Sequence, residues 1–297
     1  MKDKSEKILE QAKKKSIQEL LQFSILNMDK PAGPTSFSVD DYIRKKLNIS
    51  KTSHFGTLDP MVGGVLPISL GRACRLMEYF IHKTKTYVGI MHLHNDVDEK
   101  KLKEEIKKFT GKIKQTPPMR SRVKRVERER TVYEFEILEM NERDVLFRVK
   151  CEAGTYVRTL VHSLGNNIGG AHMTELRRVQ ASIFSEEDKE FINLYDFDKA
   201  FEEYKKGNEK ELRKILIPGE IIAKILPVVE VKAEFLKQLY NGFTLIEDYL
   251  VKKDKYEIDN KVAVFCKNTF IGVYNVINQE GRIARPEFVF KPIKFIT

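Results

Sequence analysis

The sequence predicts an α+β fold: a larger domain on a mixed or antiparallel sheet with flanking helices, followed by a small C-terminal β-barrel. Three observations lead to this class. Residues 99–109 carry Glu and Lys at helical spacing. Residues 131–139 and 145–151 concentrate β-branched and aromatic side chains on either side of a turn at 141–144. After Pro227, short apolar segments alternate with glycines, which is typical of small barrels.

In chain order, the elements divide into three segments. Residues 1–24 form a basic extension, either a weakly amphipathic helix or a disordered arm. Residues 25–220 form the larger domain, with further helices at 36–47 and 72–81 and a further strand at 86–94. Residues 221–297 form the barrel, with strands at 228–231, 263–265, 270–276 and 288–290. A charged, largely helical stretch at 185–214 joins the two domains.

The charge of the chain favours an anionic partner. Its 297 residues have a formal net charge of +10, and nucleic acid is the commonest partner of such proteins. A basic protein that is merely soluble is the alternative. No apolar run approaches the ~20 residues of a membrane span, and residues 1–15 lack the apolar part of a signal peptide. We therefore expect an intracellular protein.

The sequence indicates neither a metal nor a cofactor. Cys74, Cys151 and Cys266 lie far apart without a C-x-x-C spacing, so they predict neither disulfides nor a zinc site. His92 and His94 alternate on an expected strand and could hold a metal from one face, but no acidic or cysteine partner stands at a useful spacing. A glycine-rich phosphate loop is absent from the sequence.

The segment with the most specific chemistry is His-Phe-Gly-Thr-Leu-Asp-Pro at 54–60. A carboxylate held in such a loop, as Asp59 is, can act as a nucleophile. Capping a turn is the commoner role of an Asp before Pro. Four other segments favour chemistry: Asn-Met-Asp-Lys-Pro-Ala-Gly-Pro-Thr-Ser (27–36), Lys-Thr-Tyr-Val-Gly-Ile-Met-His-Leu-His (85–94), Glu-Ala-Gly-Thr-Tyr-Val-Arg-Thr-Leu (152–160) and Gly-Ala-His-Met-Thr-Glu-Leu-Arg-Arg (170–178).

In this order, the segments resemble the TruB-type pseudouridine synthases, and more narrowly the dyskerin subfamily, the catalytic subunit of box H/ACA ribonucleoproteins. The narrower resemblance rests on residues 91–94, 117–125 and 143–156. It implies a pseudouridine synthase catalytic domain followed by a PUA RNA-binding domain. The chain departs from the family pattern in three places. Met-Val-Gly-Gly at 61–64 replaces Lys-Val-Thr-Gly, Ala-Ser-Ile-Phe at 181–184 replaces Ser-Gly-Pro-Phe, and one residue is missing before 170–173.

The resemblance implies an isomerisation that needs no cofactor, with Asp59, Tyr87 and Arg158 as catalytic residues. Asp59 adds to the base, traps C1′ or helps to expel uracil, and the sequence leaves these routes open. Arg158 is implied as its counter-charge, with a surface arginine as the alternative. Tyr87 is implied to stack on the flipped uracil and to act on the C5 proton, with a core aromatic as the alternative.

The resemblance also implies residues that contact the substrate. His54 matches the histidine that fills the gap left by the flipped base, or it satisfies local hydrogen bonds. Lys30 matches a residue that buttresses the pocket, and Leu176 matches one that lines it. The basic run 112–130, with eight Lys and Arg against two Glu, is either a solvated loop or a surface that contacts RNA phosphates. In this run we expect Arg120, Arg122, Lys124 and Arg125 to bind RNA.

Three functions are compatible with these residues. The first is guided isomerisation of uridine in ribosomal RNA, with a guide RNA, a small zinc-ribbon protein, a glycine/arginine-rich-domain protein and a kink-turn-binding protein as partners. The second is stand-alone modification of the T-loop uridine of transfer RNA, which residues 91–94 and 117–125 disfavour. The third is a non-catalytic RNA-binding scaffold, which the presence of Asp59 and Arg158 disfavours. The lack of long lysine-rich tails favours an archaeal-type cell and a cytoplasmic location.

Overall fold

The computed structural model describes residues 4–117, 124–254, 256–279 and 281–292. The chain forms two compact units, a larger unit of residues 25–215 and a smaller unit of residues 1–24 and 216–297. The predicted α+β class with a C-terminal β-domain is confirmed. Within the described residues, no helix combines the length and the apolar character needed to cross a membrane.

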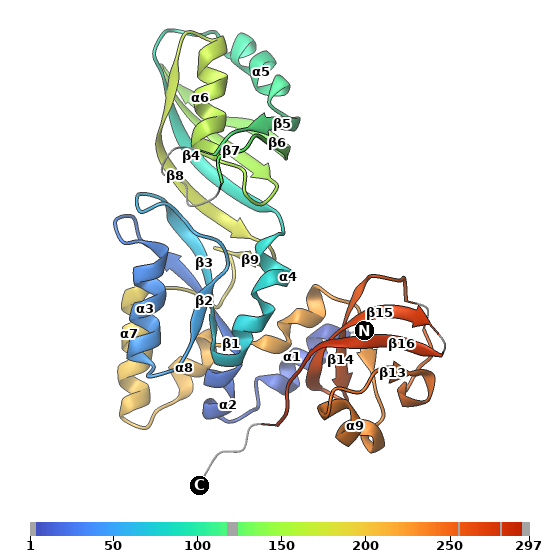
Figure 1. Ribbon diagram of the computed structural model, residues 1–297. Coiled ribbons are helices and arrows are strands. Elements are labelled where there is room, and N and C mark those ends of the chain that lie inside the picture. Colours follow the sequence, from blue (N-terminus) through green and yellow to red (C-terminus); the bar gives the residue numbers. More distant parts are fainter. Residues whose placement is uncertain (1–3, 118–123, 255, 280, 293–297) are drawn as a thin grey trace. The chain divides into compact units, whose positions relative to one another are not determined.

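The larger unit is built on one mixed sheet (Figure 1). Its strands follow the order β10, β1, β3, β8, β4, β7, β6, β5, with β2 paired to β3 and β9 paired to β8. The β1–β10 and β3–β8 pairs are parallel, and the other neighbours are antiparallel. The bounds are β1 Ser24–Lys30, β2 Thr52–His54, β3 Gly63–Leu70, β4 Lys85–Leu93, β5 Gly111–Gln115, β6 Arg128–Asn141, β7 Asp144–Cys151, β8 Ala171–Ala181, β9 Phe184–Ser185 and β10 Phe191–Asn193.

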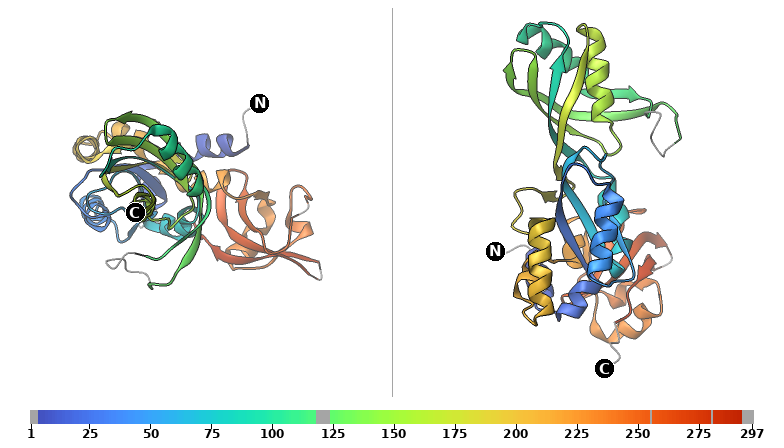
Figure 2. Two further views of the ribbon diagram at one scale, coloured as in Figure 1. Left: turned by 90° about the horizontal axis from the view of Figure 1, so that it is seen from above. Right: turned by 90° about the vertical axis from the view of Figure 1, so that its left-hand side faces the viewer.

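Helices α5 (Glu99–Lys108) and α6 (Val157–Asn167) lie on the same face of the sheet, over β4, β6 and β7 (Figures 1 and 2). The apolar stripe of α6 is buried at Val157, Leu160, Val161 and Leu164, because these positions recur at helical spacing. Arg158 lies off this stripe at the second position of the helix. Packing of α6 on the sheet therefore fixes the position of the Arg158 backbone, from which its side chain extends.

The remaining helices of the larger unit are α3 (Ser36–Lys46), α4 (Met77–Ile81), α7 (Leu194–Lys205) and α8 (Lys210–Ile215). α3 starts at an N-cap, Thr35, whose hydroxyl accepts a hydrogen bond from the Ser38 N–H at 3.0 Å. The helix expected at 72–81 is only partly α-helical, because a 3₁₀ turn at Gly71–Leu76 precedes α4. Turns of this kind are frequent at the start of α-helices.

A glycine is required where β3 and β8 meet. Their register pairs Gly63 with Arg177 and Gly64 with Arg178. Gly64 has a φ of +101°, and a Cβ atom there would lie 2.2 Å from the carbonyl oxygen of Arg178. A Cβ at Gly63 would lie 3.1 Å from the Lys30 oxygen. Position 64, where the chain keeps the glycine of the family pattern, is therefore the position that tolerates no side chain.

The smaller unit contains a curled sheet in the order β12, β14, β15, β16, β13. These strands are β12 Val228–Glu230, β13 Leu245–Ile246, β14 Lys261–Cys266, β15 Thr269–Gln279 and β16 Arg282–Val289. Residues 1–24 belong to this unit, and the separate extension predicted for them from the sequence is corrected accordingly. Helices α1 (Lys4–Ala12) and α2 (Ile17–Gln22) bury Ile8 and Leu20, and Lys15 pairs with the fully buried Glu220.

Candidate active site

Asp59 lies in the loop of residues 55–62 between β2 and β3, and the backbone of this loop is held on both sides. The Ser36 hydroxyl at the start of α3 accepts from the Leu58 N–H at 2.8 Å and donates to the Leu58 carbonyl at 3.1 Å. The Gly33 N–H donates to the Pro60 carbonyl at 2.9 Å. Leu58 is buried, while the Asp59 side chain is 60% exposed. The loop therefore presents a solvent-accessible carboxylate on a fixed backbone.

Lys30, at the end of β1, stabilises the other side of this loop. Its ammonium group is buried and donates to the carbonyls of Pro31 (2.8 Å), Pro60 (3.0 Å) and Val62 (2.8 Å). Burial lowers the pKa of Lys30, the negative charge of Asp59 raises it, and the positive charge of Arg178 lowers it. The hydrogen bonds to Pro60 and Val62 therefore support the Asp59 loop from the side of β1.

Asp59 and Arg158 form an ion pair, with 3.2 Å between Arg158 Nη2 and Asp59 Oδ2. Both side chains are 60% exposed, and an exposed ion pair contributes little to stability. The start of α6 is fixed by Gln115 of β5, whose side chain accepts from the Tyr156 N–H at 3.0 Å and donates to the Tyr156 carbonyl at 3.2 Å. The Asp59–Arg158 pair therefore contributes little to folding, and its exposed position leaves the carboxylate accessible for chemistry.

Tyr87 lies beside the buried Arg178. The β4–β8 register pairs these two residues, and the positive charge of Arg178 acts on the Tyr87 hydroxyl. Burial raises the pKa of Tyr87, and the adjacent Arg178 cation partly counteracts this effect. The negative charge of Asp59 also acts on Tyr87, so the two side chains lie within electrostatic range of each other. The structure thus brings together Asp59, Arg158, Tyr87 and Lys30.

His54 ends β2 and contacts local partners. Its Nδ1 lies 3.2 Å from Asp40 Oδ2 and its Nε2 lies 3.3 Å from Thr57 Oγ1. Thr57 belongs to the Asp59 loop, so His54 connects this loop to α3. These are the local contacts expected if His54 only satisfies hydrogen bonds within the protein. Its role of filling the gap left by a flipped base stays a prediction.

Leu176 lies on β8 opposite Gly89 of β4. A Cβ atom at Gly89 would lie 2.9 Å from Leu176 Cδ1, so the glycine leaves room for the leucine side chain. Leu176 and Tyr87 both pack against the core beneath α5 and α6. Leu176 therefore lies in the same part of the unit as Tyr87, and its contact with substrate stays a prediction.

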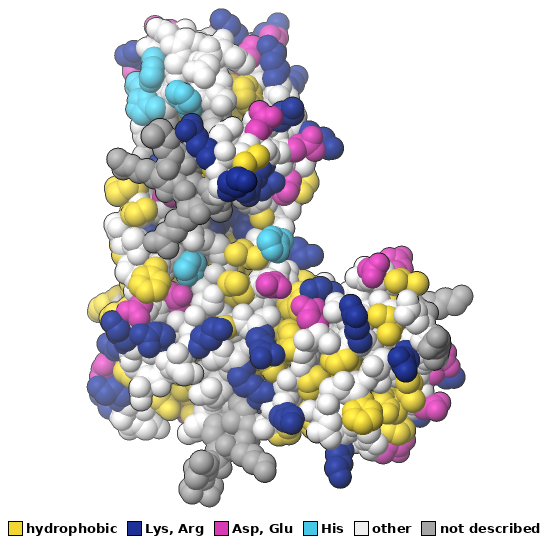
Figure 3. All heavy atoms as spheres, viewed as in Figure 1, with side chains coloured by type: hydrophobic (Ala, Val, Ile, Leu, Met, Phe, Trp, Pro, Cys, Tyr) yellow, Lys and Arg dark blue, Asp and Glu magenta, His cyan; other side chains and the backbone are white. Residues whose placement is uncertain are grey.

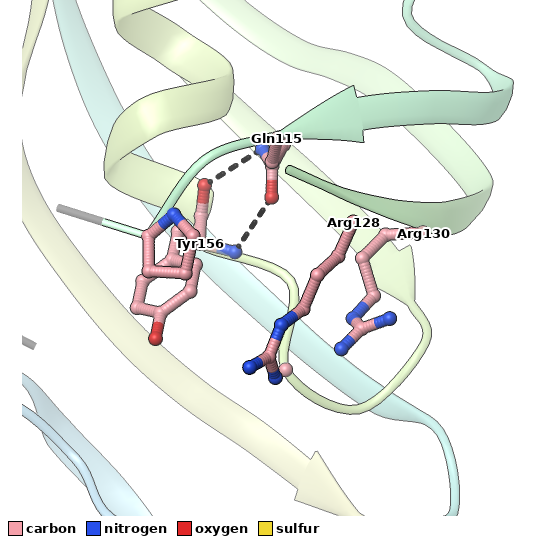
Figure 4. Close-up of a pocket in the computed structure, with 6 residues that line it drawn as sticks. Gln115, Arg128, Arg130 and Tyr156 are labelled. Atoms are coloured by element: carbon pink, nitrogen blue, oxygen red, sulfur yellow. Dashed lines mark hydrogen bonds between the residues drawn. The ribbon is translucent and has the colours of Figure 1, made fainter. Parts of the chain in front are cut away.

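The basic run is partly described. Arg120 and Arg122 lie outside the described residues, whereas Lys124 and Arg125 are exposed. Next to them is a pocket of about 80 Å³ that the sequence analysis did not identify. The guanidinium groups of Arg128 and Arg130 lie on one side of it and the Tyr156 ring on the other (Figure 4). Its lining is completed by Gln115, Pro117 and Gly154.

His92 and His94 lie on one face of β4 and its extension, as expected, and contact a third histidine. His94 Nε2 is 2.9 Å from His172 Nδ1, and His92 Nδ1 is 2.7 Å from Asp144 Oδ1. A group of histidines is visible on the surface of the larger unit (Figure 3). Among the described residues, no group of three or more His, Cys, Asp and Glu side chains is arranged to hold a metal ion.

Lys85 predicts a pH dependence of stability. It is 5% exposed, and burial, reinforced by the charge of Arg178, lowers its pKa from 10.5 to about 8. Between pH 8 and 10.5 the unfolded chain binds more protons at this site than the folded one, so the free energy of unfolding rises with pH, by up to about 3 kcal/mol. In urea titrations from pH 7 to 10, Lys85→Met should lose this rise. The exposed Lys83→Met should keep it, and equal slopes in both variants would contradict the assignment.

Comparisons with known proteins show the family of this chain. The model of the TruB family pseudouridylate synthase N-terminal domain matches residues 44–106 and 94–157, and that of the tRNA pseudouridylate synthase B C-terminal domain matches residues 158–224. A "Probable tRNA pseudouridine synthase B" of Methanopyrus kandleri is 42% identical over 252 residues, 84% of this chain and 74% of the relative. Its namesake from Pyrococcus furiosus is 45% identical over 234 residues, 78% of this chain and 68% of the relative.

Two solved structures are similar over nearly the whole chain. One is a Cbf5-Nop10-Gar1 complex, with a TM-score of 0.86, 39% identity, and coverage of 95% of this chain and 89% of that one. The other is an H/ACA RNP bound to a substrate RNA containing 2′-deoxyuridine, with a TM-score of 0.85, 38% identity, and coverage of 95% and 89%.

The fold and the relatives define an RNA pseudouridine synthase. The chain belongs to the TruB family, and its structure matches the dyskerin-type members of that family. Both assignments were expected from the ordered motifs of the sequence and are confirmed.

Proposed function

We propose that this chain converts uridine to pseudouridine in ribosomal RNA as the catalytic subunit of a guide-RNA-directed box H/ACA particle. The observation that carries this proposal is the similarity to the Cbf5-Nop10-Gar1 structure over 95% of the chain. The similarity therefore includes the curled C-terminal sheet as well as the unit with Asp59. In this proposal the C-terminal sheet is a PUA domain that binds the guide RNA, and the particle works in the cytoplasm of an archaeal-type cell.

Asp59 is the centre of the proposed reaction. Pseudouridine formation breaks the bond between C1′ and N1, turns the base over and joins C1′ to C5. A carboxylate can assist by covalent catalysis or by stabilising positive charge at C1′ while uracil leaves. The ion pair with Arg158 places a cation 3.2 Å from the carboxylate. The fixed backbone of the loop keeps the carboxylate from having to reorganise during the reaction.

Tyr87 is the proposed acceptor of the C5 proton. Once C1′ is bonded to C5, the C5–H bond breaks and its electron pair restores the C5–C6 double bond. The Tyr87 oxygen takes up the C5 proton as it releases its own hydroxyl proton to solvent, and the N1 atom released from the sugar takes up a proton from solvent, so that the product is an isomer of the substrate. A phenol oxygen beside a cation, whose charge favours the phenolate, suits this transfer.

The proposed partners follow from the similar assemblies. Those structures contain Nop10 and Gar1 or an RNA substrate. We propose that this chain likewise binds a small zinc-ribbon protein and a glycine/arginine-rich-domain protein, together with a guide RNA and a kink-turn-binding protein. Residues 112–130 and the pocket at Arg128 and Arg130 are the proposed surface for substrate phosphates.

A second function, stand-alone modification of transfer RNA, is favoured by the names of the relatives, which are called tRNA pseudouridine synthase B. Sequencing of the RNA that co-purifies with the protein distinguishes the two functions. Hairpins that end in ACA support the guided reaction. Transfer RNA without such hairpins would support the stand-alone enzyme and contradict the guided one.

RNA affinity should depend strongly on salt, because basic side chains displace counterions from phosphate. Replacing Lys124, Arg125 and Arg128 with Gln should reduce the slope of log affinity against log salt by about 0.7 for each phosphate that is no longer neutralised. Lys100, Lys101 and Lys103 on the exposed face of α5 provide a matched control, since their replacement with Gln removes the same charge. Equal slopes for the two triple variants in filter binding would assign the basic run to solvent.

A further inference from the structure

Arg178 is a buried cation that connects three parts of the site. It is 1% exposed. Its Nε donates to the Val65 carbonyl of β3 at 2.8 Å, and its Nη2 donates to the Gly56 carbonyl of the Asp59 loop at 3.0 Å. Tyr87 is its partner in the β4–β8 register, and the charge of the guanidinium acts on the Tyr87 hydroxyl. Arg178 therefore connects the backbone of the Asp59 loop to the strand position that carries the tyrosine.

The neighbouring Arg177 shows what a structural arginine looks like in the same strand. It donates to both carboxylate oxygens of Asp29 at 3.0 Å and to Glu186 at 2.8 Å. Among the described residues, Arg178 forms no ion pair within 4 Å with a carboxylate. A buried charge that is neutralised by no adjacent carboxylate is costly, and the hydrogen bonds to Val65 and Gly56 offset only part of this cost.

The electrostatic surroundings of the Tyr87 hydroxyl also indicate a role for Arg178. Burial opposes the phenolate, and so does the negative charge of Asp59. Arg178, its partner in the β4–β8 register, is the cation whose charge favours the phenolate. The charged and titratable groups that face this pair are Lys30 from β1, Asp59 from the loop, Lys85 from β4 and Cys151 from β7.

We infer that Arg178 is the positioning residue for the proton transfer at C5: it holds the Tyr87 oxygen at a fixed place relative to the Asp59 loop and stabilises negative charge on that oxygen. This inference rests on the proposed function. Arg178 touches no reacting atom in it. The proton moves from C5 to the Tyr87 oxygen, and Arg178 determines how readily that oxygen accepts it.

The test is a kinetic isotope effect. Single-turnover rates are measured with substrate RNA carrying hydrogen or deuterium at C5 of the target uridine, for the wild type, Arg178→Lys and Arg178→Met. We expect both variants to react about 100-fold more slowly, the lower end of the assistance that a positioned acid or base typically provides. We also expect a primary isotope effect that the wild type lacks, because the proton transfer becomes rate-limiting. RNA affinity and melting temperature are measured on the same samples.

Arg177→Lys is the matched control, since it perturbs the adjacent arginine without touching Tyr87 and should show no isotope effect. The double variant Tyr87→Phe/Arg178→Met should be no slower than Tyr87→Phe alone, because both changes disable one step. If Arg178→Met does not fold, Arg178→Lys and Tyr87→Phe carry the same test. Arg178 variants that are slower but show no isotope effect would overturn this inference and leave the proposed function standing. The same holds if the rate losses of Tyr87→Phe and Arg178→Met add up in the double variant. A wild type that forms no pseudouridine would overturn the proposed function as well.

Discussion

Asp59→Asn is expected to reduce pseudouridine formation to background while leaving RNA affinity almost unchanged. The substitution keeps the size of the side chain and removes the charge that each proposed route needs. The side chain is 60% exposed and its ion pair contributes little to folding, so the loop should keep its hydrogen bonds to Ser36 and Lys30. The measurement is tritium release from uridine labelled at C5, with filter binding on the same variant and with guide RNA and protein partners supplied.

Arg158→Lys is the companion variant. It keeps the positive charge but replaces a planar guanidinium with a flexible ammonium that holds a carboxylate less precisely. We expect strongly reduced release with normal binding. Loss of both activity and binding in Asp59→Asn would instead indicate a structural role for the loop, and substantial release by that variant would remove the catalytic assignment.

Gly64→Ala is expected to destabilise the larger unit by about 3–5 kcal/mol, the sum of a strained backbone and an overpacked contact. At a φ of +101°, the new methyl group would lie 2.2 Å from the Arg178 carbonyl oxygen and 2.9 Å from its nitrogen. Both are backbone atoms of β8, so neither can move aside without separating β3 from β8. Urea unfolding monitored by circular dichroism measures the loss.

Gly207→Ala separates the two contributions. Gly207 has a φ of +91°, and no atom lies within 4 Å of a Cβ placed there. This variant should therefore lose only the backbone contribution, about 1–2 kcal/mol. Equal losses at the two glycines would show that the contact between β3 and β8 is not the cause.

The elements that the sequence predicted best are those whose pattern is local. The stripe of α6 and the hairpin of β6 and β7 were placed within a few residues, because each is encoded by its own periodicity. The first turn expected at 72–81 is 3₁₀ instead, a difference that periodicity does not resolve. The place of residues 1–24 was missed because it depends on partners distant in sequence, such as Glu220 for Lys15.

In the candidate site too, local motifs predicted some residues, while others depend on partners distant in sequence. The ordered motifs predicted Asp59, Arg158 and Tyr87 as catalytic residues. The structure pairs Asp59 with Arg158 and places Tyr87 within electrostatic range of Asp59, while their roles in catalysis stay predictions. The sequence predicted no role for Arg178, because an arginine in a strand is usually a surface residue. Its burial depends on the carbonyls of Gly56 and Val65, which are distant in sequence. The pocket at Arg128 and Arg130 was missed because it needs the end of β5, the start of β6 and the loop before α6 side by side.

The most direct test of guided catalysis at Asp59 is a guide exchange. Two guide RNAs direct the purified protein, with its partners, to two different uridines of one ribosomal RNA fragment, each labelled in turn with tritium at C5. We expect release to follow the guide, to require it, and to be absent with Asp59→Asn for either guide. Release from the same uridine whichever guide is present, or release from transfer RNA without any guide, would contradict the account.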